Sequence, residues 1–123
     1  MRAVLLRHIN HLAMIKAAFK IERCADATYS FRLVDAQQRA LLSSDHHATQ
    51  PACERTINHL KMIVGQQAGI HVLSTAQHNW MFVAMLNNSM LAHSALYSTL
   101  EACELDANRV RSLAPEAACL PCA

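Results

Sequence analysis

The chain has 123 residues, 53% of them hydrophobic and 16% charged, and its formal net charge at pH 7 is +2. This apolar content excludes a disordered chain, and the nearly neutral charge gives no sign of a nucleic-acid partner. No run of about eighteen apolar residues is present, so we expect no membrane span, and the length fits one compact domain.

Residues 1–18 are expected to form a helical extension. They hold basic side chains and no acidic one, and Leu5, Ile9 and Leu12 recur at i, i+4 and i+7, which predicts one apolar stripe suited to an interaction. The alternatives are a targeting or membrane-surface segment, or a start at Met14.

Three short strands are predicted next, because apolar and polar residues alternate in each. They are "FKIERC" (19–24), "TYSFRLV" (28–34) and "RALLSS" (39–44). The same order returns later as "GIHVLS" (69–74), "NWMFVAML" (79–86) and "SMLAHS" (89–94). Between the second and third strands, Asn87 and Asn88 suit a tight turn, whereas "DAQQR" predicts a wider loop.

A helix is predicted after each set of strands. Thr49 and Thr99 are suitable N-caps, and each predicted helix has one apolar stripe. The first stripe is Cys53, Ile57, Leu60 and Val64, and the second is Cys103, Ala107, Val110 and Ala114. Each half of the chain therefore reads as βββα, with the helix covering the apolar face of a sheet.

The two halves also contain segments with identical residues at matching positions. "TQPACERTINHL" (49–60) and "TLEACELDANRV" (99–110) are identical at five positions, against about one expected by chance. We therefore predict an α+β fold of two tandem βββα repeats, residues 19–64 and 70–114, in a two-layer arrangement of helices on an antiparallel sheet. Residues 115–123 are expected to form a C-terminal tail.

This pattern resembles the YegP-like family of small bacterial proteins, whose domain has no known function. The resemblance lies in F-x-I, in Y/W-x-F-x-L/A, in an apolar strand ending in Ser, in His47 or Tyr97, and in the Thr-capped helix. It implies a duplicated βββα unit with pseudo-twofold symmetry and a common sheet. It supplies no catalytic residues.

Candidate chemistry rests on cysteines and histidines. Cys53 and Cys103 lie near helix N-termini, where a thiol can be a nucleophile, but their place on the apolar stripes favours packing. Cys119 and Cys122 form C-x-x-C without the second pair of a zinc ribbon, and His46 and His47 offer two metal ligands without a third. They are weak metal candidates, and we expect no cofactor. Five cysteines without a secretory signal favour reduced thiols in the cytoplasm.

No nucleophile elbow, phosphate loop or pair of catalytic acids is present, so we expect a protein that is not an enzyme. The first hypothesis is an interaction module that binds a second copy of itself, as a homodimer, or another protein through sheet edges or an apolar face. The second is a protein that binds a small molecule or metal in a groove between the repeats, near His46, His47, Trp80 and Tyr97.

Overall fold

The backbone forms one mixed sheet and two helices, so the fold is α+β. The structure is a computed structural model, and it describes residues 17–65 and 69–121. Most of the predicted helical extension, with Leu5, Ile9 and Leu12, lies outside these residues, and so does Cys122. The last two residues of that extension, Ala17 and Ala18, are the first two of a β-strand, so the helical prediction is wrong for them. Among the described residues, no helix is long and apolar enough to cross a membrane.

The strands and helices follow the predicted order. The first half of the chain contains β1 (Ala17–Arg23), β2 (Tyr29–Asp35), β3 (Ala40–Ser43) and α2 (Gln50–Ile63). The second half contains β4 (Ile70–Ser74), β5 (Trp80–Leu86), β6 (Ser89–His93) and α3 (Leu100–Leu113). The 3-10 helix η2 (Ala114–Glu116) and a short strand, β7 (Ala118–Leu120), end the described chain.

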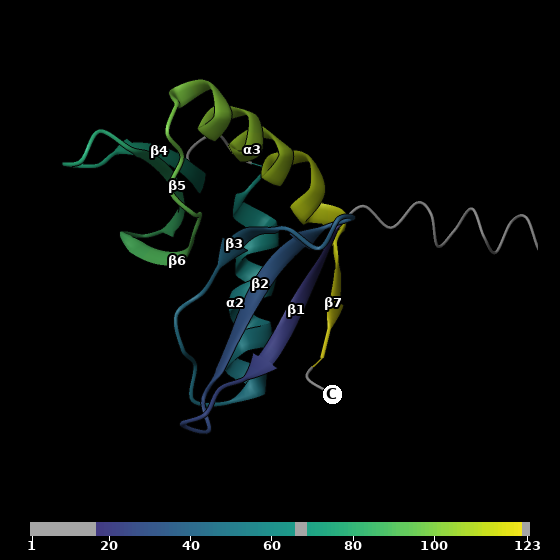
Figure 1. Cartoon of the computed structure of the whole chain (residues 1–123). Helices are drawn as coiled ribbons and strands as arrows, with labels where there is room; N and C mark the ends of the chain where they lie inside the picture. The colour runs from purple at the N-terminus through teal and green to yellow at the C-terminus, as the bar shows by residue number, and fades with distance from the viewer. Residues whose placement is uncertain (1–16, 66–68, 122–123) are drawn as a thin grey trace, which may run out of the picture.

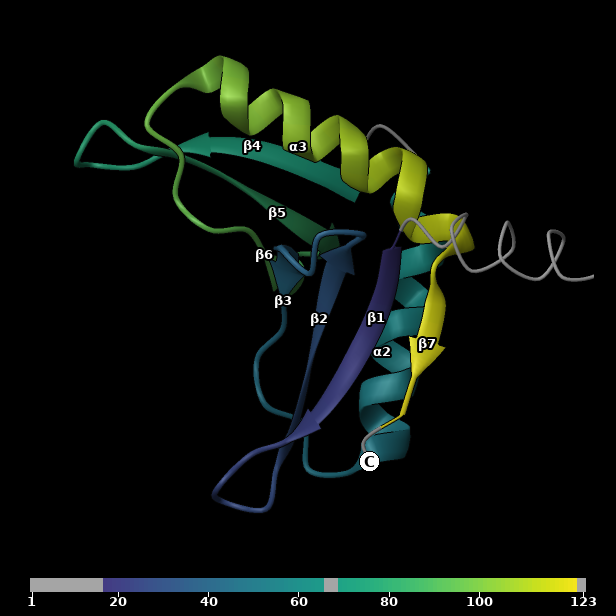
Figure 2. The same cartoon turned by 45° about the vertical axis from the view of Figure 1, so that its right-hand side comes forward.

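The seven strands form one sheet in the order β4-β5-β6-β3-β2-β1-β7. The halves join where β3 pairs with β6 at Ser43 and His93. Strands β1, β2, β3 and β7 form one wing of the sheet and β4, β5 and β6 form the other, and the two wings are steeply inclined to each other at this junction (Figures 1 and 2). Helix α2 packs on β1 and β2, and α3 packs on β4 and β5. The two helices therefore cover one wing each.

The predicted tail contains a strand that the sequence did not suggest. Strand β7 pairs in parallel with β1, with Cys119 opposite Phe19, whereas neighbours within each half pair antiparallel. This pairing makes the sheet mixed and adds a strand beyond β1 at one edge of the sheet.

Local geometry is matched between the halves. In both, a Ser hydroxyl accepts from the backbone N–H of a core phenylalanine: Ser44 from Phe31 and Ser94 from Phe82, each at 2.9 Å. Thr49 and Thr99 cap their helices by accepting from Ala52 and Ala102, each at 3.1 Å. The predicted caps are therefore confirmed.

The second hairpin of each half explains why the halves differ in length by one residue. In "DAQQR", the N–H of Gln38 binds the carbonyl of Asp35 over 2.9 Å and Gln38 has φ 64°, which makes a three-residue loop. The corresponding turn in the second half uses Asn87 and Asn88, both at positive φ, as a two-residue loop. The wider loop was predicted, but the left-handed residue in it is a glutamine.

The core is a single apolar cluster shared by both halves. The predicted stripes are fully buried, and they are Cys53, Ile57, Leu60, Val64, Cys103, Ala107, Val110 and Ala114. Phe19, Phe31 and Phe82 fill the space beneath them, with Phe19 and Phe31 meeting edge to face at 5.8 Å between ring centroids. Packing of both helix stripes into one core holds the halves together.

Candidate functional site

In the described part of the chain, two polar clusters and two of the hollows are best suited to carry a function. The first cluster joins the halves of the chain. It contains Asp35 and Arg39 from the β2–β3 hairpin and Tyr97, Asp106 and Arg109 from the second half. Both carboxylates are buried, at 3% residue exposure.

Each carboxylate of this cluster accepts from both arginines. Asp106 receives Arg39 at 3.0 Å and Arg109 at 3.4 Å, and Asp35 receives Arg109 at 3.2 Å and Arg39 at 3.4 Å. The charges balance, so burial of the acids is compensated. The Tyr97 hydroxyl also donates to Asp106 over 2.7 Å.

The pKa values reflect this arrangement. Burial alone would raise the pKa of Asp35, but hydrogen bonds from the backbone N–H groups of Arg39 and Gln37 and from the Arg109 and Arg39 side chains outweigh it, so the pKa is lowered. Burial, followed by the bond to Asp106, raises the pKa of the Tyr97 hydroxyl. Asp35 is therefore held ionised and Tyr97 neutral, as in a structural cluster.

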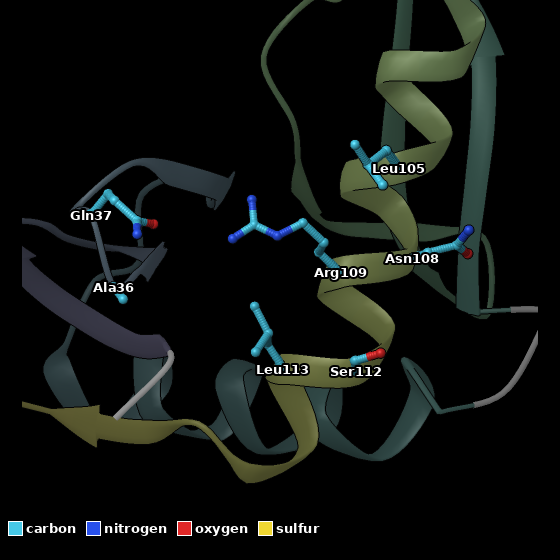
Figure 3. Close-up of a pocket in the computed structure, with 7 residues that line it drawn as sticks. All are labelled: Ala36, Gln37, Leu105, Asn108, Arg109, Ser112 and Leu113. Atoms are coloured by element: carbon cyan, nitrogen blue, oxygen red, sulfur yellow. The ribbon is translucent and has the colours of Figure 1, made fainter. Parts of the chain in front are cut away.

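A hollow of about 450 Å³ adjoins this cluster, between the β2–β3 hairpin and α3 (Figure 3). Arg109 points across it from α3 toward the hairpin that carries Ala36 and Gln37, and Leu105 and Leu113 line the helix side. The wall of the hollow is mainly apolar. The charge of Arg109 is already compensated, because its guanidinium pairs with both buried carboxylates.

The second polar cluster lies at the tip of the β1–β2 hairpin. The Cys24 Sγ, an Asp26 carboxylate oxygen and a ring nitrogen of His46 all lie within 4.8 Å of one another. Cys24 is half-buried, and Asp26 and His46 are exposed. A hydrogen bond from the Thr28 hydroxyl, followed by the one from its backbone N–H, lowers the pKa of Asp26, and His46 adds to this effect.

The predicted pair of His46 and His47 does not form a site. His46 turns to Asp26, whereas the Nε2 of His47 lies 2.9 Å from the Thr56 hydroxyl and its ring packs on Phe31. The predicted groove is also absent from the hollows described here: Tyr97 stacks on Phe82, and Trp80 pairs with Tyr97 through the backbone. Adjacent residues of an extended segment point to opposite sides, which separates His46 from His47.

The structure describes three of the four predicted thiols. Cys53 and Cys103 are fully buried, and burial raises both pKa values, that of Cys53 to about 11. A neutral buried thiol is a poor nucleophile, which supports the packing interpretation. Cys119 is exposed on β7, and its C-x-x-C partner, Cys122, lies outside the described residues.

A last feature is the open face of the second half. On the sheet face away from α3, β4 and β5 border a hollow of about 390 Å³. Its wall combines apolar with polar side chains, from Leu73, Val83, Met85, His71, Asn87 and Asn88. Leu73 is 45% exposed, and nearby on β6 Met90 is 44% exposed. Leu73 therefore presents a large apolar side chain at the edge of the sheet where β4 lies, and Met90 presents one two strands further in.

The architecture places the chain in a class of small α+β proteins with a seven-stranded mixed sheet and two helices. Its fold is that of the solution NMR structure of YegP from E. coli, a protein of unknown function, with a TM-score of 0.81 and 15% identity over 88% of this chain and 94% of that one. A UPF0339 protein from Shewanella oneidensis has the same TM-score, with 12% identity over 86% of this chain and 91% of that one.

The predicted YegP-like resemblance is thus confirmed for the fold. A scan against protein-family models and a search of curated proteins each found no match. The two similar structures therefore supply no activity for this chain.

Proposed function

We propose that the chain is a non-enzymatic interaction module that pairs through the outer edge of β4, first of all with a second copy of itself. The observation that carries this proposal is that β4 is the last strand of the sheet on its side, with no strand on its outer edge among residues 17–65 and 69–121. An open strand edge is a template for another strand.

The composition of β4 supports the same proposal. Its sequence, "IHVLS", has no lysine, acid or proline, which are the usual means of protecting an edge. The opposite edge, β7, is only three residues long, and short strands make poor templates. The exposed Leu73 of β4 would then be covered by the partner.

The backbone groups available on β4 can be identified from its hairpin. The N–H of Thr75 binds the carbonyl of Asn79 within the hairpin, and hydrogen-bonding positions alternate along an antiparallel pair. Leu73 therefore directs its backbone groups to β5, and Val72 and Ser74 direct theirs to the open edge. Ser74 is the better position for a test because its side chain is exposed and Val72 packs on the core.

The test is a proline at this position. Ser74→Pro removes one outward N–H, whereas Ser74→Ala keeps it and serves as the matched control. We expect wild type and Ser74→Ala to show a concentration-dependent dimer by analytical ultracentrifugation, and Ser74→Pro to remain monomeric. A monomeric wild type, or a Ser74→Pro chain that dimerises equally well, would contradict self-association through this edge.

The matched geometry of the two halves supports a tandem duplication with pseudo-twofold symmetry, as the YegP-like resemblance implies. The isolated bridges Tyr29–His47 and Trp80–Tyr97, the helix caps and the Ser–Phe bonds all have counterparts at a spacing of 50 or 51 residues. Under this proposal the two repeats differ at their first strands. In the first repeat β7 pairs with the outer edge of β1, whereas in the second repeat the outer edge of β4 is open.

The predicted role of residues 1–18 remains a prediction. If Leu5, Ile9 and Leu12 contribute to assembly, then Leu5→Ser with Ile9→Ser weakens the dimer without changing the unfolding of the core. A double variant with the same dissociation constant as wild type would remove this segment from the interface and leave the β4 proposal in place. The predicted cytoplasmic location and reduced thiols are retained as part of the same proposal.

A second candidate function is the binding of a small, mostly apolar molecule in the hollow between the β2–β3 hairpin and α3. The size of the hollow, about 450 Å³, is suitable for such a ligand. Ser112→Tyr would fill the hollow, and Glu116→Gln is a control on η2. We expect NMR fragment screening to find binders that wild type and Glu116→Gln share and that Ser112→Tyr has lost.

A further inference from the structure

We propose that Cys24, Asp26 and His46 form a Zn²⁺ site at the tip of the β1–β2 hairpin. The three residues supply the three kinds of protein ligand that Zn²⁺ accepts, namely a thiolate, a carboxylate and an imidazole nitrogen. Their ligand atoms already lie within 4.8 Å of one another. Such a site is independent of the β4 edge, which belongs to the other half of the chain.

The distances are close to those of a metal site. Zn–ligand bonds of 2.0–2.3 Å in a tetrahedron place neighbouring ligand atoms about 3.5 Å apart. The Nδ1 of His46 lies 3.5 Å from an Asp26 carboxylate oxygen. The Cys24 Sγ therefore has to approach by no more than about 1.3 Å, which a side-chain rotation can supply.

The backbone that carries these ligands is tied together on both sides. The hairpin is closed by bonds from the N–H of Cys24 to the carbonyl of Thr28, at 2.7 Å, and from the N–H of Ala27 to the carbonyl of Cys24, at 3.1 Å. The segment with His46 is held against it, because Tyr29 and His47 exchange two backbone hydrogen bonds, of 2.8 and 2.6 Å. The ligands are therefore brought together before any metal binds.

Polar groups around the cluster would orient the ligands. The 2.9 Å contact between the Thr28 hydroxyl and the Nδ1 of His46 would be replaced by the bond to the metal. The Thr28 hydroxyl would still donate to Asp26, and the Ser30 hydroxyl lies 3.5 Å from the Cys24 Sγ. Such outer contacts fix the rotamers of metal ligands. A thiolate and a carboxylate would together neutralise Zn²⁺, and the solvent side leaves one position for water.

The nature of the ligands selects the metal. Ca²⁺ and Mg²⁺ prefer oxygen ligands and need more of them than this hairpin offers. Sulfur and imidazole nitrogen favour Zn²⁺. Loading of the site releases the thiol proton, so binding weakens as the pH falls.

The second half of the chain shows that the fold does not require these side chains. Its first hairpin is closed by the same bonds, from the N–H of Thr75 to Asn79 and from that of His78 to Thr75, and His78 has the positive φ that Ala27 has in the first. The counterparts of Cys24, Asp26 and His46 there are Thr75, Gln77 and Leu96. The ligand set is thus specific to one of two similar hairpins.

The experiment is a calorimetric titration of the full, reduced, metal-free chain with Zn²⁺, in competition with a chelator of known affinity. We expect one equivalent to bind, and Cys24→Ser and His46→Gln each to lower the affinity at least about tenfold. Cys119→Ser and His59→Gln are the controls, since they remove an exposed cysteine and an exposed histidine elsewhere, and they should bind like wild type. Circular dichroism verifies that each variant is folded.

A second measurement uses wild type alone and so does not depend on the variants. Zn²⁺ should slow the alkylation of Cys24 by iodoacetamide and leave that of Cys119 unchanged, as followed by peptide mass. The proposal is overturned if wild type binds no Zn²⁺, if Cys24→Ser and His46→Gln bind as tightly as the controls, or if Cys24 is not protected.

Discussion

Arg39, in the β2–β3 hairpin, donates to the buried carboxylate of Asp106 on α3 over 3.0 Å and so links the two halves of the chain. The same carboxylate accepts from Tyr97 and Arg109. Removal of Asp106 would leave the Tyr97 hydroxyl without its acceptor and leave Arg39 and Arg109 with Asp35 alone. A stability test of this junction follows directly.

We expect Asp106→Ala to lower the free energy of unfolding by about 2–3 kcal/mol. This is somewhat less than the loss of about 3–5 kcal/mol that is typical when one partner of a fully buried ion pair is removed, because Arg39 and Arg109 are partly exposed. Urea denaturation measures this change. Asp45→Ala, which removes an exposed carboxylate, should change the same free energy by less than about 0.5 kcal/mol. Equal losses in both variants would contradict a structural role for the cluster.

The lowered pKa of Asp35 predicts loss of stability in acid. The unfolded chain binds a proton at Asp35 near pH 4, before the folded chain does, so the contribution of this carboxylate is present above about pH 4 and is lost as the pH falls through its lower folded pKa. The free energy of unfolding should therefore decrease as the pH falls below about 5.

Asp35→Asn is the variant for this test, and Asp45→Asn is its control. Urea titrations at successive pH values should show a weaker pH dependence in Asp35→Asn, even though that variant is less stable at neutral pH. If the two variants have the same pH dependence as wild type, Asp35 is not the group that titrates.

Much of the fold was predictable because it depends on local signals. Alternation marked six strands, and Thr49 and Thr99 cap their helices as expected. The apolar stripes of both helices are fully buried. These features follow from the spacing of apolar residues and from the helix-capping residues, and both can be identified within a single segment of the sequence.

The features that were missed depend on contacts between distant segments. Strand β7 is too short for a period to show, and its partner, β1, lies about a hundred residues earlier. The metal-type cluster combines Cys24 and Asp26 with His46, which only the bridge between Tyr29 and His47 brings close. No spacing rule contains this information.

One signal for the cluster between the halves was present. Asp106 lies between the stripe residues Cys103 and Ala107, a position that puts an acid on or beside a buried helix face, although no prediction was drawn from it. A buried acid requires a cationic partner. The identity of that partner, Arg39, sixty-seven residues away, depended on the packing of α3 against the hairpin.

The two glycines should respond oppositely to a methyl group. A Cβ on Gly69 would lie 2.1 Å from the carbonyl oxygen and 2.7 Å from the carbonyl carbon of Ile63, whereas a Cβ on Gly65 would meet nothing within 4 Å. Gly69→Ala should therefore cost about 1–3 kcal/mol of unfolding free energy, because backbone must move. Gly65→Ala should be neutral or stabilise by up to about 1 kcal/mol, since it restricts the unfolded chain. Thermal and urea unfolding of both variants measure the difference, and a Gly69→Ala chain as stable as Gly65→Ala would contradict the close approach to Ile63.

The buried thiols should be unreactive as long as the chain is folded. The pKa of Cys53 is raised from 9.0 to about 11, so its thiolate fraction at pH 8 is about a hundredfold smaller than that of an ordinary thiol, and its side chain is fully buried. We expect iodoacetamide at pH 8 to modify Cys119 in the folded chain, and Cys53 and Cys103 only after urea unfolding. Peptide mass spectrometry separates the three sites, and modification of Cys53 in the folded chain as fast as that of Cys119 would revive the nucleophile hypothesis for the helix N-terminus.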